Sequence, residues 1–143
     1  MAKLGENIGK PKLLIIKNYV KIKKYLHLPV QSGSDTILKA MNRGYTRKFY
    51  LDLTDNYRRI VPDGALTTDI IVGFPSESQE DFKDTVDLVR AVSFDAAFIF
   101  KYSPRPHTQA ADFADDVPKP EKEGRHKVVL DLQKKISKKC QER

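Results

Sequence analysis

Cysteine is almost absent from this sequence, since Cys140 is the single one among 143 residues. An internal disulfide is therefore impossible, and so is a zinc or iron–sulfur site built from several cysteines of this chain. No apolar run approaches the ~20 residues of a membrane-spanning helix, and the first twelve residues lack the apolar segment of a signal peptide. We therefore expect a cytoplasmic protein without a membrane partner. Cys140, close to the C-terminal end, is expected to be an exposed thiol in a frayed basic tail.

Common catalytic motifs are missing as well. Residues 5–11 contain two glycines and a lysine, but a Walker A loop needs four residues between its glycines and Ser or Thr after the lysine. The G-x-G-x-x-G, G-x-S-x-G and H-E-x-x-H patterns do not occur. The histidines at positions 27, 107 and 126 have no metal-ligand spacing. The sequence therefore carries no short motif that names a reaction.

Basic residues are concentrated at the two ends of the chain. Residues 1–24 carry a local charge of +6 and residues 122–143 one of +5, while residues 25–121 carry −4. Two interpretations are open: the ends are solvated basic segments, or they contact a polyanion such as RNA, whose phosphates Lys and Arg neutralise.

One pattern occurs three times: a short apolar run, a turn rich in Gly, Pro or Ser, and an amphipathic helix. The runs are residues 25–30, 65–72 and 96–102, and the predicted helices are 35–42, 47–61, one that starts after Ser78, and 122–139. A connector at residues 112–120 precedes the last helix, which has Val128, Val129, Leu132 and Ile136 on one side. Ser34 and Thr46 are expected N-caps, and Ser78 with Asp81 resembles a capping box. Strands separated by such helices predict an α/β fold with a parallel sheet.

The carboxyl ends of parallel strands lie at a common edge, where ligands bind in many α/β folds. We therefore expect the turns at residues 31–34, 73–76 and 102–105 to be neighbours in space. They either form a small-ligand cleft or are simply loop residues that end buried strands. Asp69 lies within an apolar strand, on the same face as Ile71 and Gly73. Its carboxylate is expected either to face a site or to bond to a neighbouring strand or cap.

Four segments resemble the MiaB-type tRNA methylthiotransferases, which are radical S-adenosylmethionine (SAM) enzymes. They are residues 26–35 (LHLPVQSGSD), 38–46 (LKAMNRGYT), 67–75 (TTDIIVGFP) and 100–106 (FKYSPRP), in family order. The last segment favours this branch over the RimO type, whereas the related MtaB type stays open as an alternative.

The resemblance implies a partial TIM-like barrel, of which this chain holds the C-terminal half with about three parallel strands and flanking helices. It divides the chain into a basic N-terminal segment (1–24), helical or poorly ordered, a half-barrel (25–121), and a basic helix (122–143) leading toward an absent TRAM domain. In the family, [4Fe–4S] clusters are held by cysteines that this chain lacks. The resemblance therefore implies a piece of a tRNA-modifying enzyme that is inactive alone and whose partners are tRNA and the missing half of the barrel.

The resemblance also implies a SAM site at the strand-end turns. Gln31 and Ser32 are placed near the ribose and methionine end, and Ile71 and Gly73 at the adenine, with Asp69 on the same strand face. Tyr102 and Ser103 complete the adenine side. Contacts with RNA phosphates are assigned to Arg105 and to Lys134 and Lys138 of the basic last helix. The alternative function is a non-catalytic interaction or RNA-binding module, which self-associates through an open sheet edge.

The chain departs from the family pattern at two turn positions. Ser76 and His107 stand where relatives usually have glycine. Glycine adopts positive φ at little cost, so these substitutions constrain loops that use that conformation.

Overall fold

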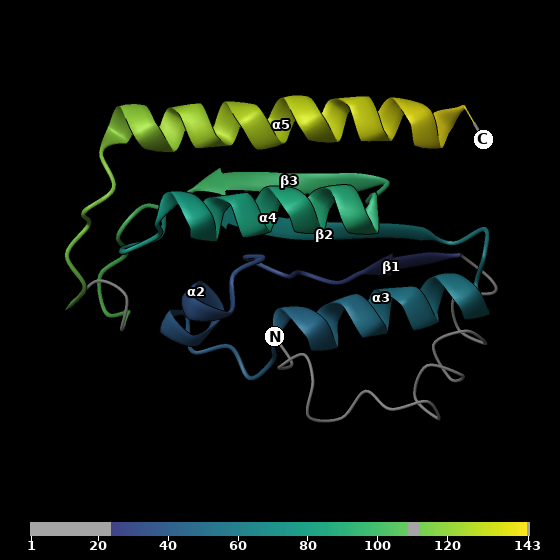
Figure 1. Cartoon of the computed structure of the whole chain (residues 1–143), viewed down its shortest axis with the longest axis horizontal. Coiled ribbons are helices and arrows are strands. Elements are labelled where there is room, and N and C mark those ends of the chain that lie inside the picture. The colour runs from purple at the N-terminus through teal and green to yellow at the C-terminus, as the bar shows by residue number, and fades with distance from the viewer. Residues whose placement is uncertain (1–23, 109–111, 143) are drawn as a thin grey trace.

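The computed structural model describes residues 24–108 and 112–142. The expectation for the N-terminal segment therefore lies almost wholly outside the described residues. The described elements, labelled in Figure 1, are strands β1 (Tyr25–His27), β2 (Ala65–Val72) and β3 (Ala96–Lys101), and helices α2 (Asp35–Ala40), α3 (Arg47–Ile60), α4 (Gln79–Val92) and α5 (Lys119–Gln141).

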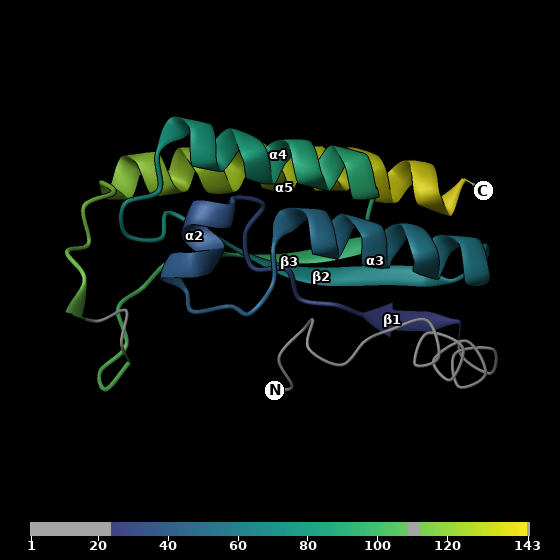
Figure 2. The same ribbon diagram turned by 60° about the horizontal axis from the view of Figure 1, so that its bottom comes forward.

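The three strands form one parallel sheet in the order β1-β2-β3. Helices α3, α4 and α5 pack as a layer on one face of this sheet, as the two views of Figures 1 and 2 show. The predicted α/β fold with three parallel strands is therefore confirmed. Among the described helices, none is both long enough and apolar enough to cross a membrane.

The core lies between the sheet and the helices. Alternate residues of β2 point into it, and the largest fully buried side chains there are Leu66, Ile70 and Val72 of the sheet, Tyr50 and Tyr57 of α3, Leu88 and Val89 of α4, and Phe94. The other residues of β2 and β3 point to the opposite side of the sheet. We call this side the open face; it carries Tyr25, His27, Thr67, Asp69, Ile71, Phe98 and Phe100.

Helix starts agree with the sequence prediction. The hydroxyls of Ser34 and Thr46 accept bonds from amides in the first turns of α2 and α3, and Ser78 with Asp81 forms the predicted capping box. Helix α5 begins earlier than predicted, at Lys119 instead of residue 122. Pro120, expected to belong to a connector, instead lies in the first turn of α5, where a missing N–H costs nothing.

The first predicted strand is shorter in the structure than in the sequence interpretation. Regular pairing ends at His27, because the amide of Val30 donates to the Thr68 side chain at 2.9 Å and not to the backbone of β2. Pairing returns only as an isolated bridge between Gln31 and Ile70.

Two expectations about the last helix are wrong. Cys140 is not in a frayed tail: it lies within α5, half-buried, with its Sγ 4.0 Å from the carbonyl oxygens of Ser93 and Phe94. Val128, expected on the same side of the helix as Val129, is 50% exposed, while Val129 is fully buried. Adjacent helical residues differ by about 100° around the axis, so only one of the pair faces the sheet.

Gly33 lies where the turn after β1 meets α4. Its amide donates to the Thr85 hydroxyl at 2.9 Å, and a Cβ at this position would lie 2.5 Å from the Asp84 carbonyl oxygen and 2.6 Å from the Thr85 Cα. Both are backbone atoms, so they cannot move aside as a flexible side chain would. Gly33 therefore sets how closely this turn approaches α4.

We expect Gly33→Ala to lower the free energy of unfolding by about 1–3 kcal/mol, the usual cost of overpacking. Gly44→Ala is the matched control, because a Cβ there meets nothing within 4 Å. Urea unfolding of both variants measures the difference. Equal stabilities would show that the turn moves away from α4 without cost.

Candidate functional site

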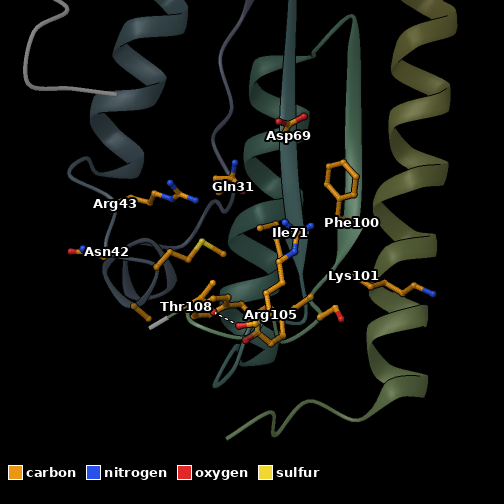
Figure 3. A pocket seen from close by; sticks show the side chains of 14 residues that line it. Gln31, Asn42, Arg43, Asp69, Ile71, Phe100, Lys101, Arg105 and Thr108 are labelled. Atoms are coloured by element: carbon orange, nitrogen blue, oxygen red, sulfur yellow. Dashed lines mark hydrogen bonds between the residues drawn. The ribbon is translucent and has the colours of Figure 1, made fainter. Parts of the chain in front are cut away.

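A cavity of about 760 Å³ opens at the carboxyl edge of the sheet. Its walls come from the turn after β1, the end of α2, the open face of β2, and the end of β3 with its loop (Figure 3). The lining residues are Gln31, Ala40, Met41, Asn42, Arg43, Asp69, Ile71, Phe74, Phe100, Lys101, Tyr102, Ser103, Arg105 and Thr108. The three strand-end turns predicted to be neighbours therefore meet here.

Gln31 is held at the cavity by the backbone of β2. Its amide donates to the Asp69 carbonyl at 2.9 Å, and its carbonyl accepts from the Ile71 amide at 2.9 Å. Its φ is +73°, in the left-handed region that non-glycine residues rarely adopt. Two hydrogen bonds to β2 thus fix the backbone of Gln31.

Asp69 combines the two roles that the sequence left open. It lines the cavity, and its carboxylate lies 3.4 Å from Nε2 of His27 on the neighbouring strand. The other ring nitrogen of His27, Nδ1, lies 2.7 Å from the Thr67 hydroxyl. The carboxylate is 27% exposed, so a ligand in the cavity has access to it.

The turn after β3 is fastened to β2 and to α5. The Tyr102 amide donates to the Val72 carbonyl at 2.8 Å, and the Tyr102 carbonyl accepts from Nζ of Lys122 at 3.2 Å. The Tyr102 ring packs edge-on against Phe74 at 5.1 Å between centroids, and Lys122 lies over it. Burial, together with the Asp115 carboxylate, raises the pKa of Tyr102. The phenol therefore stays neutral at physiological pH.

A buried ion pair ties α5 to the turn after β2. Arg125 donates from Nη1 to Oε1 of Glu77 at 2.7 Å, and the same oxygen accepts from the Gly73 amide at 2.9 Å. Arg125 also donates to Glu121 at 2.6 Å. Burial raises the pKa of Glu77, while the Gly73 amide and Arg125 oppose that shift. The pair fixes the turn that carries Gly73 and Phe74.

Arg125→Met would leave the Glu77 carboxylate buried without its cation. We expect this change to lower the free energy of unfolding by about 3–5 kcal/mol, as for other broken buried pairs. Lys127→Met on the same helix is the control, since it removes an exposed pair with Asp131 and is expected to leave stability unchanged. Thermal and urea unfolding would contradict the prediction if the two variants behaved alike.

Several residues assigned from the sequence lie outside the cavity wall. Ser32 is fully buried, and its hydroxyl accepts from the Ser34 amide and lies 3.4 Å from the Thr85 hydroxyl. Gly73 packs against α5, where a Cβ would lie 2.4 Å from Cγ of Lys122. Lys134 and Lys138 are exposed on α5. By contrast, Gln31, Asp69, Ile71, Tyr102, Ser103 and Arg105 all line the cavity.

Both departures from the family pattern fall at positive φ. Ser76 has φ +68°, and so has His107. The Ser76 amide donates to the Asp116 carboxylate at 2.7 Å. The turn after β2 thus keeps a glycine-like conformation with a serine in it.

The profile of the radical SAM superfamily matches residues 9–89, more than half of the chain. The chain belongs to this superfamily. Among solved structures, a similar one is coproporphyrinogen III oxidase (HemN) from Escherichia coli, a radical SAM enzyme, with a TM-score of 0.68 and 21% identity over 92% of this chain and 30% of that one. This likeness confirms the partial-barrel fold.

Within the superfamily, similar curated proteins include tRNA-2-methylthio-N(6)-dimethylallyladenosine synthases, the MiaB type. The protein of Endomicrobium trichonymphae is 53% identical over 117 residues, which are 82% of this chain and 28% of that protein. That of Parabacteroides distasonis is 52% identical over 126 residues, 87% of this chain and 28% of its own length. The chain thus spans less than a third of the length of these relatives.

The residues of this radical SAM chain do not fit an iron–sulfur cluster. Cys140 is the single cysteine, and it lies beside Ser93 and Phe94, before the start of β3 and so at the opposite end of the sheet from the cavity. Within residues 24–108 and 112–142, no three His, Cys, Asp or Glu side chains gather as a metal site. The described residues of this chain therefore supply no ligand set for a cluster.

Arg43 and Phe100 are two of the lining residues that the sequence analysis did not assign to the site. In Figure 3 Arg43 points toward Gln31, and no ion pair is found for it among the described residues. The sequence could have indicated Arg43, because this residue lies inside the family-like segment 38–46. Phe100 was interpreted as part of an apolar strand, and only the register with Ile71 places its ring beside the cavity.

Proposed function

We propose that this chain is the SAM-binding half-barrel of a tRNA methylthiotransferase of the MiaB type. The whole enzyme would convert N6-isopentenyladenosine (dimethylallyladenosine) in tRNA to its 2-methylthio form at C2. The observation that carries the proposal is the convergence of three strand-end turns, far apart in sequence, on one cavity. A role on tRNA implies a cytoplasmic location.

The cavity suits SAM in size and in chemistry. Its volume of about 760 Å³ lies within the roughly 300–1,000 Å³ of small-molecule sites. The side-chain amide of Gln31 and the Asp69 carboxylate would bond the ribose hydroxyls, while Ile71 would pack on the adenine. Tyr102 and Ser103 would complete the adenine side, with Ser32 and Gly73 shaping the turns from behind.

Arg43 adds a cation to this site. Its guanidinium points into the cavity from the turn after α2 (Figure 3), and a carboxylate is the natural partner of an arginine that has no ion pair among the described residues. SAM carries one carboxylate, at its methionine end. We therefore assign Arg43 to that end of the ligand, beside Gln31.

Radical chemistry needs SAM together with a reduced [4Fe–4S] cluster, which this chain does not ligate. The chain alone would bind and orient SAM but would not turn it over. Catalysis would require the missing half of the barrel with its cluster cysteines.

We expect SAM to bind the chain with a submillimolar Kd, and Asp69→Asn to weaken binding about tenfold, the effect of one charge-assisted hydrogen bond. Arg43→Gln should weaken SAM binding similarly. Asp55→Asn on the exposed side of α3 is the matched control. Calorimetry gives the affinities, and NMR shifts should be confined to residues 31–34, 43, 69–73 and 102–105. Shifts elsewhere, or no binding, would contradict the proposed function.

RNA contacts form the second part of the proposal. Arg105 lies at the cavity mouth, and Lys134 and Lys138 are one turn apart on the exposed side of α5. No ion pair involves these three cations among the described residues, whereas Lys48 and Lys127 pair with aspartates. Unpaired cations are available to neutralise phosphates.

If these lysines contact RNA, Lys134→Gln and Lys138→Gln should each lower the slope of log K against log salt by about 0.7–0.9. The probe is a tRNA anticodon stem-loop, and binding is followed by fluorescence anisotropy. Lys48→Gln on α3 is the control, because its charge is paired with Asp52. An unchanged slope would place the RNA elsewhere.

A non-catalytic interaction module remains the alternative. Within the described residues, β1 and β3 are both edge strands, and unpaired strand edges attract another chain. The missing half of the barrel is the partner that the proposed function requires, and a second copy of this chain is the competitor.

A further inference from the structure

Two phenylalanine rings lie exposed on the open face of the sheet. Phe98 is 58% exposed and Phe100 is 53% exposed, among the highest values for large apolar side chains in the described part of the chain. The strand residues between and before them, Ala97 and Ile99, pack against the core on the other side. The rings therefore contribute nothing to the helix–sheet core.

The two rings continue the cavity along β3. Phe100 lines the cavity beside Ile71 (Figure 3), with which it is in register, and Phe98 is in register with Asp69. Since side chains two residues apart on a strand are separated by about 6.6 Å, the pair forms a continuous apolar surface. His27 closes its far side, edge-on to Phe98 at 6.3 Å between ring centroids.

On this surface the aromatic rings of Phe98 and Phe100 lie beside the polar side chains of Asp69 and His27. Flat apolar faces suit a nucleobase, which stacks on aromatic side chains, and they also suit a short hydrocarbon chain. A nucleoside with an apolar substituent offers both a nucleobase and a hydrocarbon group. The relatives at about 50% identity are named for an adenosine that carries a dimethylallyl group.

We propose that Phe98 and Phe100 contact the modified base of the RNA substrate and select for its dimethylallyl group. The inference rests on the proposed function and deepens it, because it assigns substrate specificity to β3 while SAM occupies the floor formed by Gln31, Asp69 and Ile71. The continuity of the rings with the cavity favours this occupant over a second copy of the chain.

The test compares two nucleosides on the 143-residue chain. N6-dimethylallyladenosine is expected to bind at least about tenfold more tightly than adenosine, as for other apolar substituents that enter an apolar site. NMR titration should shift the ring resonances of Phe98 and Phe100. Phe98→Ala and Phe100→Ala should each reduce the preference to about threefold or less, whereas Phe100→Leu should retain part of it.

Val128→Ala is the control variant, because this side chain is 50% exposed on α5 and does not lie on the sheet. It should keep the full preference. Thermal unfolding of each variant establishes that the fold is intact, which the exposure of both rings favours.

A SAM titration in the same samples separates this inference from the proposed function. If SAM binds and the two nucleosides bind equally, the assignment to Phe98 and Phe100 is wrong and the SAM site stands. If SAM fails to bind while the nucleoside preference depends on the rings, the SAM site is wrong and the assignment stands. If sedimentation shows a dimer that Phe98→Ala dissociates, with no nucleoside preference, the rings are a contact between copies.

Discussion

Parallel pairing on the central strand β2 is the constraint on which the other features depend. β2 bonds to β1 on one side and to β3 on the other, and all three strands run in the same direction. Their carboxyl ends therefore lie at one edge, and the helices that connect them lie on one face. The cavity at that edge and the open face are both direct results of this pairing.

Helix α5 holds the turns at the carboxyl edge of the sheet in place. Helix α5 bonds to the turn after β2 through Arg125 and to the turn after β3 through Lys122, and both side chains are buried. Charged groups at this depth are stable only with partners, which here are Glu77 and Asp115. The same helix that covers the sheet therefore also fixes two walls of the cavity.

The sequence predicted most of the fold because its local signals agree. Ser34, Thr46 and Ser78 act as the caps that their positions suggest, and the apolar run of residues 65–72 is a strand over the predicted range. The predicted ends of β1 and α5 were wrong, because contacts with a neighbouring element, and not local sequence preference, decide where these two elements end. β1 ends early because Val30 bonds to a side chain on β2, and α5 extends past Cys140 because its end packs on Ser93 and Phe94.

The site was only partly predictable for a related reason. Alternation along β2 placed Asp69 and Ile71 on one face, but it could not show that Ser32 turns toward Thr85 and away from the cavity. Arg43 and Phe100 line the cavity because of where α2 packs and how β3 pairs with β2. The residue pattern within one strand cannot show either of these.

Ser76 and His107 show what holds the turns around the cavity in their shape. Both hold positive φ without the glycine that makes this conformation easy, at a backbone cost on the order of 1 kcal/mol each. Local preference therefore opposes the shape of these turns, and the shape persists because surrounding contacts impose it. Contacts from the rest of the domain therefore set the geometry of the cavity edge. This geometry is kept even where serine or histidine stands in place of the glycine that would adopt it most readily.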